Sequence, residues 1–231
     1  MSVGQVINGN IDMALISSLT DHAKRSDSLA PLLAVTGVIL AGGRATRMGG
    51  RDKGLLLLAG EPLIVHSIRR LQPQVAELLI SANRHLDIYQ QFGCRVIRDS
   101  ESGFRGPLAG ILTALQAAGT PYVLTAPCDS PRLPPDYARR MAAALAQGQA
   151  TVSVACYAGD WQPVFALLPV ALQDDLARYL AAGEGGVHRW LRRHQPAVVA
   201  FADRPQWFCN INTPDDLAQL EATWGNGRSE P

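Results

Sequence analysis

The sequence has few cysteines, and their spacing suits neither a disulfide framework nor a metal site. Its four cysteines lie far apart along 231 residues and form no C-x-x-C pair or Cys/His cluster. This spacing argues against structural zinc and against a small scaffold held together by disulfides. The four are Cys94, Cys128, Cys156 and Cys209.

Long apolar runs and an excess of one charge are also absent. No apolar run approaches the roughly 20 residues that span a bilayer. The first basic residue is Lys24, so the basic region of a secretory signal is missing. The 21 Lys and Arg against 20 Asp and Glu leave a formal charge of +1. This balance excludes a positive electrostatic field over the whole molecule that would attract nucleic acid or anionic lipid. We expect a cytoplasmic protein with no nucleic-acid or membrane partner, in which any anion site is local.

The composition is that of a globular chain. Hydrophobic residues make up 47% of the sequence and charged residues 18%, and the length suits one large α/β domain. Residues 1–34 are mostly small and polar and precede the first strong strand pattern. We therefore predict a poorly ordered N-terminal extension over 1–34 and a single domain over 35–231.

From Val35 onward, short β-branched or aliphatic runs alternate with longer helical patterns. This alternation is typical of a parallel sheet covered by helices. The predicted strands are 35–40, 77–81, 95–97, 122–126, 150–157, 163–168 and 197–201. The predicted helices are 62–71, 85–92, 108–118, 135–147, 170–182, 187–193 and one that begins at Pro214, with Thr213 as its cap.

One pair of predicted strands requires a reversal of direction. The strands 150–157 and 163–168 are joined around Gly159 and Asp160, and a parallel crossover would need a dozen or more residues. We therefore predict a three-layer α/β/α fold whose Rossmann-like sheet is mainly parallel with one reversed strand.

The most informative segment, 40–53, directly follows the first predicted strand, where open α/β sheets bind their ligands. Gly42 and Gly43 allow a tight turn whose N–H groups can face phosphate oxygens. Four cations, Arg44, Arg47, Arg51 and Lys53, lie within ten residues. The segment therefore predicts a polyphosphate site. It matches neither a Walker A loop, because no Gly-Lys-Ser/Thr is present, nor the G-x-G-x-x-G dinucleotide pattern.

The pattern L-A-G-G-x-x-x-R-M-G-x-x-D-K over 40–53 resembles the signature of nucleotidyltransferases with the nucleotide-diphospho-sugar transferase type of fold. Within them the chain is most similar to the molybdenum cofactor guanylyltransferases, which join GMP from GTP to molybdopterin. Five further segments carry the resemblance: Ser81-Ala82-Asn83-Arg84, Ile97-Arg98-Asp99, Gly106-Pro107-Leu108-Ala109-Gly110, Pro127-Cys128-Asp129-Ser130-Pro131 and Asn210-Ile211-Asn212-Thr213-Pro214.

The resemblance implies roles for individual residues. Lys53 neutralises charge as the α-phosphate is attacked, Asp129 binds Mg²⁺, and these two form the catalytic set with Arg47. Asn210 and Asn212 lie on the pterin side. The implied nucleotide-binding residues are Leu40, Ala41, Gly42, Gly43, Lys53, Ser81, Asn83, Asp99, Gly106, Pro107 and Asp129.

Several of these residues have ordinary structural alternatives. Lys53 suits a solvated surface lysine, Asp129 and Asp99 suit turns, and the two asparagines suit Asx turns. Ser81 departs from the family pattern, because close relatives can carry asparagine there, so either Ser81 or Asn83 makes the nucleotide contact.

The resulting prediction is a Mg²⁺-dependent guanylyltransferase acting on GTP and molybdopterin or Mo-molybdopterin. Transient contacts with the protein that delivers molybdopterin and with recipient molybdoenzymes would accompany it. The alternatives are a molybdenum cofactor cytidylyltransferase, another sugar-phosphate type nucleotidyltransferase, and a noncatalytic nucleotide sensor.

Overall fold

The structure is a computed structural model that describes residues 34–42, 52–99, 106–148, 150–202 and 207–224. The predicted N-terminal extension lies outside the described residues except for Ala34, which is exposed. The predictions for Gly43 and Arg47 also fall outside them.

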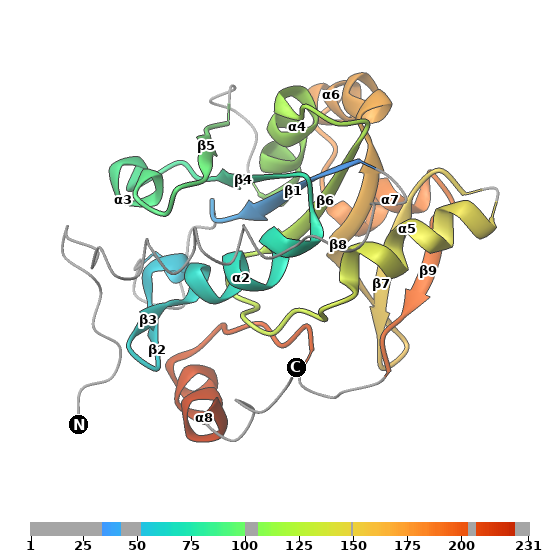
Figure 1. Cartoon of the computed structure of the whole chain (residues 1–231). Coiled ribbons are helices and arrows are strands. Elements are labelled where there is room, and N and C mark those ends of the chain that lie inside the picture. Colours follow the sequence, from blue (N-terminus) through green and yellow to red (C-terminus); the bar gives the residue numbers. More distant parts are fainter. Residues whose placement is uncertain (1–33, 43–51, 100–105, 149, 203–206, 225–231) are drawn as a thin grey trace.

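A seven-stranded sheet with the order β5-β4-β1-β6-β8-β7-β9 forms the centre of the molecule (Figure 1). Among the described strands of this sheet, β8 alone runs antiparallel to its neighbours, which confirms the predicted reversed strand. The strands are β1 (Val35–Leu40), β4 (Glu77–Ser81), β5 (Arg95–Ile97), β6 (Tyr122–Pro127), β7 (Ser153–Tyr157), β8 (Asp160–Pro169) and β9 (Ala197–Ala200).

The register brings the carboxyl ends of four parallel strands to one edge. Leu40 lies opposite both Ser81 and Pro127, and Ser81 lies opposite Ile97. Just beyond the strands, the N–H of Ala41 donates to the oxygen of Ser81 at 2.8 Å. The segments that follow β5, β4, β1 and β6 therefore meet side by side.

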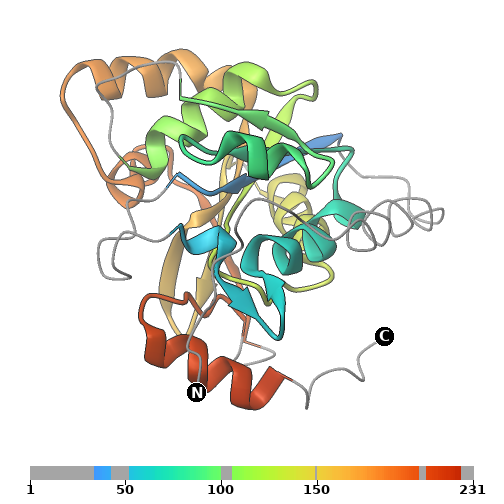
Figure 2. The same cartoon turned by 90° about the vertical axis from the view of Figure 1, so that its left-hand side faces the viewer.

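Helices cover both faces of the sheet, as Figure 2 shows from the side, so the predicted three layers are confirmed. The first face packs against α2 (Leu63–Leu71), α3 (Leu86–Gln90) and α5 (Tyr137–Gln147). The second packs against α4 (Pro107–Ala117), α6 (Gln173–Ala181) and α7 (Val187–Arg192). Two short 3-10 turns, η3 (Gln72–Gln74) and η4 (Val170–Leu172), precede β4 and α6.

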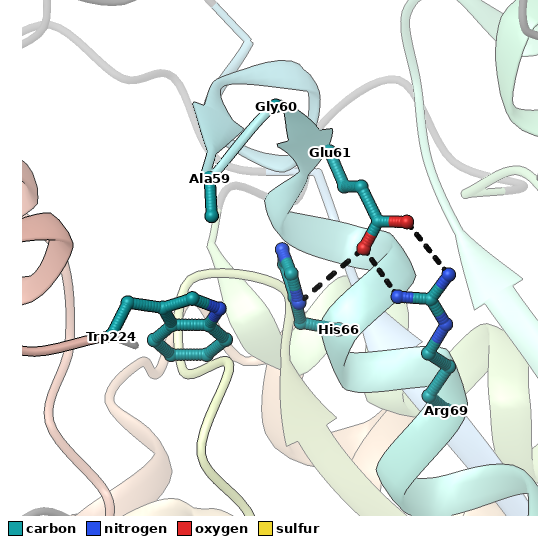
Figure 3. Close-up of a pocket in the computed structure, with 6 residues that line it drawn as sticks. All are labelled: Ala59, Gly60, Glu61, His66, Arg69 and Trp224. Atoms are coloured by element: carbon teal, nitrogen blue, oxygen red, sulfur yellow. Dashed lines mark hydrogen bonds and ion pairs between the residues drawn. The ribbon is translucent and has the colours of Figure 1, made fainter. Parts of the chain in front are cut away.

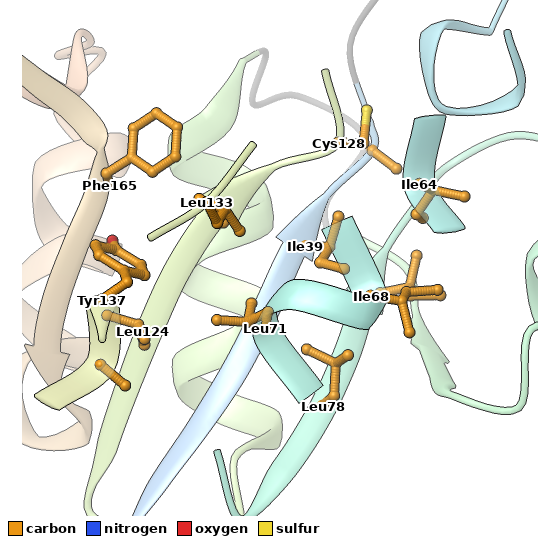
Figure 4. Close-up of a cluster of buried hydrophobic side chains, with 14 of the residues drawn as sticks. Ile39, Ile64, Ile68, Leu71, Leu78, Leu124, Cys128, Leu133, Tyr137 and Phe165 are labelled. Carbon is orange, nitrogen blue, oxygen red and sulfur yellow. The ribbon is translucent and has the colours of Figure 1, made fainter. Parts of the chain in front are cut away.

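Helix α2 illustrates how the sequence produces this packing. Ile64, Ile68 and Leu71 recur at the spacing of one helical face, and all three are fully buried against β1 and β4 (Figure 4). Burial of each such side chain is worth about 1.5–3 kcal/mol. The same apolar stripe anchors the helix over the strands that end at the predicted site.

The sequence patterns missed a small hairpin between the predicted phosphate loop and α2. Strands β2 (Leu57–Leu58) and β3 (Glu61–Pro62) pair through a turn in which Ala59 and Gly60 both have positive φ. Two-residue strands are too short to show alternation, so the pattern was not visible. Because Pro62 belongs to this hairpin, α2 begins at Leu63 rather than at the predicted Pro62.

The last helix, α8 (Pro214–Trp224), packs on the hairpin rather than on the main sheet. Buried apolar side chains of the hairpin region, the start of α2, the segment before α8 and α8 itself form a separate small core: Leu56, Leu58, Leu63, Ile211 and Leu217. This packing brings the chain before α8 back to the edge where β6 ends. None of the helices in the described ranges is long and apolar enough to cross a membrane.

Candidate active site

Lys53 lies in the short 3-10 turn η2 (Lys53–Leu55) and contacts two other predicted site residues. Its Nζ donates to Oδ2 of Asp129 at 2.8 Å and to Oδ1 of Asn212 at 2.9 Å. The side chains of Lys53 and Asp129 are 19% and 15% exposed, so the pair is largely shielded from water yet reachable. The fold thus joins residues that are 76 and 159 positions apart in sequence.

Asp52 holds the backbone that leads into Lys53. Its Oδ1 accepts a hydrogen bond from the Tyr89 hydroxyl at 2.6 Å and one from the Gly54 N–H at 3.2 Å. Burial raises the pKa of Asp52, while the bond from Tyr89 opposes that rise. A Cβ at Gly54 would lie 2.5 Å from the Tyr89 oxygen, so glycine is required for this approach. Sequence reasoning missed Tyr89, which has no recognisable signal of its own.

Asp129 is held directly after β6. The N–H of Cys128 donates to the oxygen of Leu40 at 3.1 Å, and the oxygen of Asp129 accepts from the N–H of Ile211 at 2.9 Å. Burial raises the pKa of the Cys128 thiol well above its ordinary value. A neutral buried thiol is a poor nucleophile, so Cys128 suits packing rather than nucleophilic chemistry.

The segment before α8 lies across the same site. Asn210 is hydrogen-bonded to Ser130, and Asn212 to Lys53. Asp216 accepts from the N–H groups of Asn212 and Thr213 at 2.9 and 2.8 Å, and its own N–H donates to Oγ1 of Thr213 at 3.1 Å. This reciprocal cap confirms Thr213 as the predicted helix cap. The N–H of Asn212 and the other cap bonds lower the pKa of Asp216.

On the other side of β1, Asn83 and Asp99 form a reciprocal pair. The Asn83 amide donates to Oδ2 of Asp99 at 2.7 Å and accepts from the Asp99 N–H at 3.1 Å. Oδ1 of Asp99 is buried and has no hydrogen-bond partner within the described structure. A Cβ at Gly42 would lie 3.2 Å from the Asn83 amide nitrogen, so the glycine lets β1 end against this pair.

Ser81 and Asn83 differ in their burial. Ser81 is 2% exposed and lies beneath helix α4, where a Cβ at Gly110 would come within 2.6 Å of the serine oxygen. Asn83 is partly exposed at the strand edge. This geometry favours Asn83 over Ser81 for a nucleotide contact, and the contact itself stays a prediction.

The remaining predicted residues border the same edge. Leu40 ends β1, the buried Ala41 follows it, and the exposed Gly106 and Pro107 open α4. Gly106 has a φ of 107°, a conformation that favours glycine. Gly43 and Arg47 lie outside the described residues, and their roles stay predictions.

The donor set around Asp129 limits the kind of metal site that the chain could form. No cluster of three or more His, Cys, Asp or Glu side chains occurs within the described ranges. Asp129 brings a single carboxylate to a position where the Lys53 ammonium already lies between two oxygens. Mg²⁺ is often held by one or two carboxylates with phosphate oxygens and water, so this set fits a metal that arrives with a phosphate substrate.

A separate hollow of about 390 Å³ lies between the β2–β3 hairpin, α2 and the end of α8 (Figure 3). Glu61 and Arg69 form an ion pair on its wall, and a His66 ring nitrogen lies 3.0 Å from the Leu58 oxygen. None of the predicted site residues lines this hollow. Its lining residues are Ala59, Gly60, Glu61, His66, Arg69 and Trp224.

Comparison with known proteins agrees with the fold and with the loop pattern. Residues 37–198 match the family model of the MobA-like NTP transferase domain. The chain is 50% identical over 188 residues to a molybdenum cofactor guanylyltransferase of Shewanella amazonensis, a match covering 81% of this chain and 96% of the relative. It is 48% identical over 202 residues to the Burkholderia ambifaria enzyme of the same name, covering 84% and 98%.

A solved structure supports the architecture. The molybdopterin-guanine dinucleotide biosynthesis protein A of Archaeoglobus fulgidus superposes with a TM-score of 0.69 at 23% identity, covering 83% of this chain and 99% of that one. This likeness concerns the fold. The family model and the two close relatives lead to one conclusion: the chain belongs to the molybdenum cofactor guanylyltransferase family.

Proposed function

We propose that this protein transfers GMP from GTP to molybdopterin, in its free or Mo-bound form, to give molybdopterin guanine dinucleotide and pyrophosphate. Family membership supports the reaction class. The observation that carries the proposal is the contact between Lys53 and Asp129, which places an ammonium beside a carboxylate at the carboxyl edge of the sheet. That edge is where α/β proteins of this kind bind nucleotides.

The chemistry requires little of the protein beyond positioning and charge. A terminal phosphate oxygen of molybdopterin attacks the α-phosphorus of GTP in line, a new P–O bond forms, and the bond to the β-phosphate breaks. The attacking oxygen is already anionic, so no Ser-His or Cys-His pair is needed. Lys53 stabilises the charge on the transferring group, and backbone N–H groups of the glycine loop orient the phosphates.

The order of strands supports an extended binding mode for GTP. Asp99 follows β5 and Asp129 follows β6, so they are separated by three strand spacings of about 4.8 Å each, or about 14 Å. The phosphates lie near Lys53 and Gly42, and the nucleoside lies toward Asn83 and Asp99. The unpartnered oxygen of Asp99 would then accept an N–H or O–H of the nucleoside.

Asp129 is the residue proposed to hold Mg²⁺ together with the substrate phosphates. The ion would supply further positive charge at the triphosphate. Three further assignments rest on the sequence pattern. They are Arg47 to catalysis, Gly43 to nucleotide binding and Asn210 to the pterin side. A cytoplasmic location and contacts with molybdopterin-delivering and recipient proteins likewise stay predictions.

A pyrophosphate-release assay with the four nucleoside triphosphates, Mg²⁺ and molybdopterin tests the reaction. We expect release with GTP and only in the presence of the pterin acceptor. Preference for CTP would replace the proposal with the cytidylyltransferase alternative. Tight GTP binding without pyrophosphate release would instead favour the nucleotide sensor.

A further inference from the structure

The segment expected to face the pterin also contacts the proposed catalytic lysine. Oδ1 of Asn212 accepts from Nζ of Lys53 at 2.9 Å, almost the same distance as the carboxylate of Asp129 on the same ammonium. Neither the loop pattern nor the strand order predicts this bond, because α8 and its leading segment are absent from the main sheet.

The two acceptors affect the lysine differently. A carboxylate offsets the charge of the ammonium, whereas the amide oxygen of Asn212 is neutral and orients the group without cancelling its charge. Lysine has a flexible four-carbon stem, and two acceptors restrict it far more than one. If Asp129 is engaged elsewhere when substrate binds, Asn212 still offers an acceptor for Lys53.

Asn212 is itself firmly held. Its N–H donates to Asp216 at 2.9 Å within the α8 cap. The preceding residue, Ile211, is 2% exposed, and its N–H donates to the oxygen of Asp129 at 2.9 Å. The amide that meets Lys53 is therefore tied both to the cap of α8 and to the backbone after β6.

We propose that Asn212 is a positioning residue that aims the Lys53 ammonium at the nucleotide phosphates. It thereby makes the segment before α8 part of the nucleotide site rather than of the pterin site alone. The inference rests on the proposed function, because it assumes that Lys53 meets a nucleoside triphosphate.

A double-mutant cycle tests the inference. GTP affinity is measured by calorimetry with Mg²⁺ and without acceptor for the wild-type chain, Lys53→Ala, Asn212→Ala and the double variant. Asn212→Ala should weaken GTP binding about tenfold in the wild-type background, as expected for loss of a hydrogen bond to a charged group, and have little effect once Lys53 is absent. An equal loss in both backgrounds, or no loss in either, would overturn the proposal.

Two further variants separate positioning from a general structural role. Asn212→Asp should weaken GTP binding at least as much as Asn212→Ala, because a second carboxylate offsets the lysine charge. Asn210→Ala is the matched control: its side chain bonds to Ser130, so its effect on GTP binding should simply add to that of Lys53→Ala. Thermal unfolding of every variant identifies any loss that arises from misfolding.

Steady-state kinetics distinguish the nucleotide from the pterin. Positioning of Lys53 predicts that Asn212→Ala lowers kcat/KM for GTP, whether or not the KM for molybdopterin also changes. A rise in the molybdopterin KM alone would overturn the inference. Failure of the proposed function would show itself separately, as a wild-type chain that does not use GTP. The coupling between Lys53 and Asn212 is then measured with whichever triphosphate that chain binds.

Discussion

At Lys53, one ammonium lies between a carboxylate and an amide and is largely shielded from water. A surface lysine with no role would instead be well exposed, as most lysines are. The surroundings of Lys53 are also specific: Asp52 just before it is buried and bonded to Tyr89. The local structure thus holds this side chain at the sheet edge, where a phosphate would approach.

Replacement of this lysine tests its part in the reaction. Lys53→Ala removes the positive charge proposed to stabilise the transferring phosphate, and kcat should fall by about 10²–10³. Pyrophosphate release in the presence of GTP, Mg²⁺ and molybdopterin measures the effect. Arg178→Ala, an exposed change on α6, serves as the control. Full turnover by Lys53→Ala would show that the lysine has no role in the chemistry.

Among the elements, α4 packs closely against the strand ends at the proposed nucleotide side of the site. Its first turn passes over Ser81 and Leu40, where a Cβ at Gly110 would lie 2.6 Å from the serine oxygen and 3.1 Å from Cδ2 of the leucine. The helix can approach the strand ends this closely only because position 110 lacks a side chain.

A single added methyl group should therefore displace α4. Gly110→Ala is expected to cost about 1–3 kcal/mol of unfolding free energy through overpacking, and to weaken GTP binding. Chemical denaturation and calorimetry measure the two effects. Gly185→Ala is the matched control, because nothing lies within 4 Å of the Cβ that would be added there. Equal stability of the two variants would contradict the packing argument.

The β2–β3 hairpin, α2 and α8 are joined around His66. Its ring lies 3.0 Å from the Leu58 oxygen and packs edge-on against Trp224 with ring centroids 4.8 Å apart. Burial lowers the pKa of His66, and the bond to the Leu58 oxygen and the charge of Glu61 oppose that shift. The neutral ring is therefore the form that suits the fold.

This pKa shift predicts how stability depends on pH. With a folded pKa below the unfolded value of about 6.5, the unfolded chain takes up a proton first as the pH falls. Stability should then drop below about pH 6.5, by at most about 1.4 kcal/mol per pH unit from this one group. Denaturation curves give the free energy of unfolding at pH 8 and pH 5.5. Its drop between the two should be smaller for His66→Gln than for the control His188→Gln, which changes an exposed residue. Identical drops would rule out His66 as the source.

For the whole molecule, the described sheet, its two helical layers and the cap around α8 form one structure that includes every described site residue. The family model begins at residue 37, within β1. We predict that the catalytic domain starts near residue 35 and does not require what precedes it.

Removal of residues 1–33 tests this domain boundary. The shortened chain should keep its melting temperature, its GTP affinity and its pyrophosphate release, because the described contacts of the site come from residue 40 onward. Limited proteolysis of the full chain should also cleave within residues 1–31 before it cleaves elsewhere. Resistance of that segment, or loss of activity on its removal, would contradict the predicted extension.

The sequence alone determined the layers and the reversed strand, and it showed that cations gather in the loop over 44–53. Buried strands such as Val35–Leu40 and Glu77–Ser81 were predicted to the residue, because continuous apolar runs and the turns that bound them are local signals. The resemblance to the family pattern pointed to Lys53 and Asp129, and Asp129 also comes shortly after a buried strand.

Only the tertiary structure decided how the site is assembled. It put Ser81 beneath α4 and Asn83 at the edge, and it brought Asn212 to Lys53 across 159 residues. That bond depends on a small core between the hairpin and α8. The hairpin strands are two residues long, which is too short to show a periodic pattern in the sequence. Local patterns report which residues prefer to be buried, whereas contacts between distant segments arise only when those buried faces pack together.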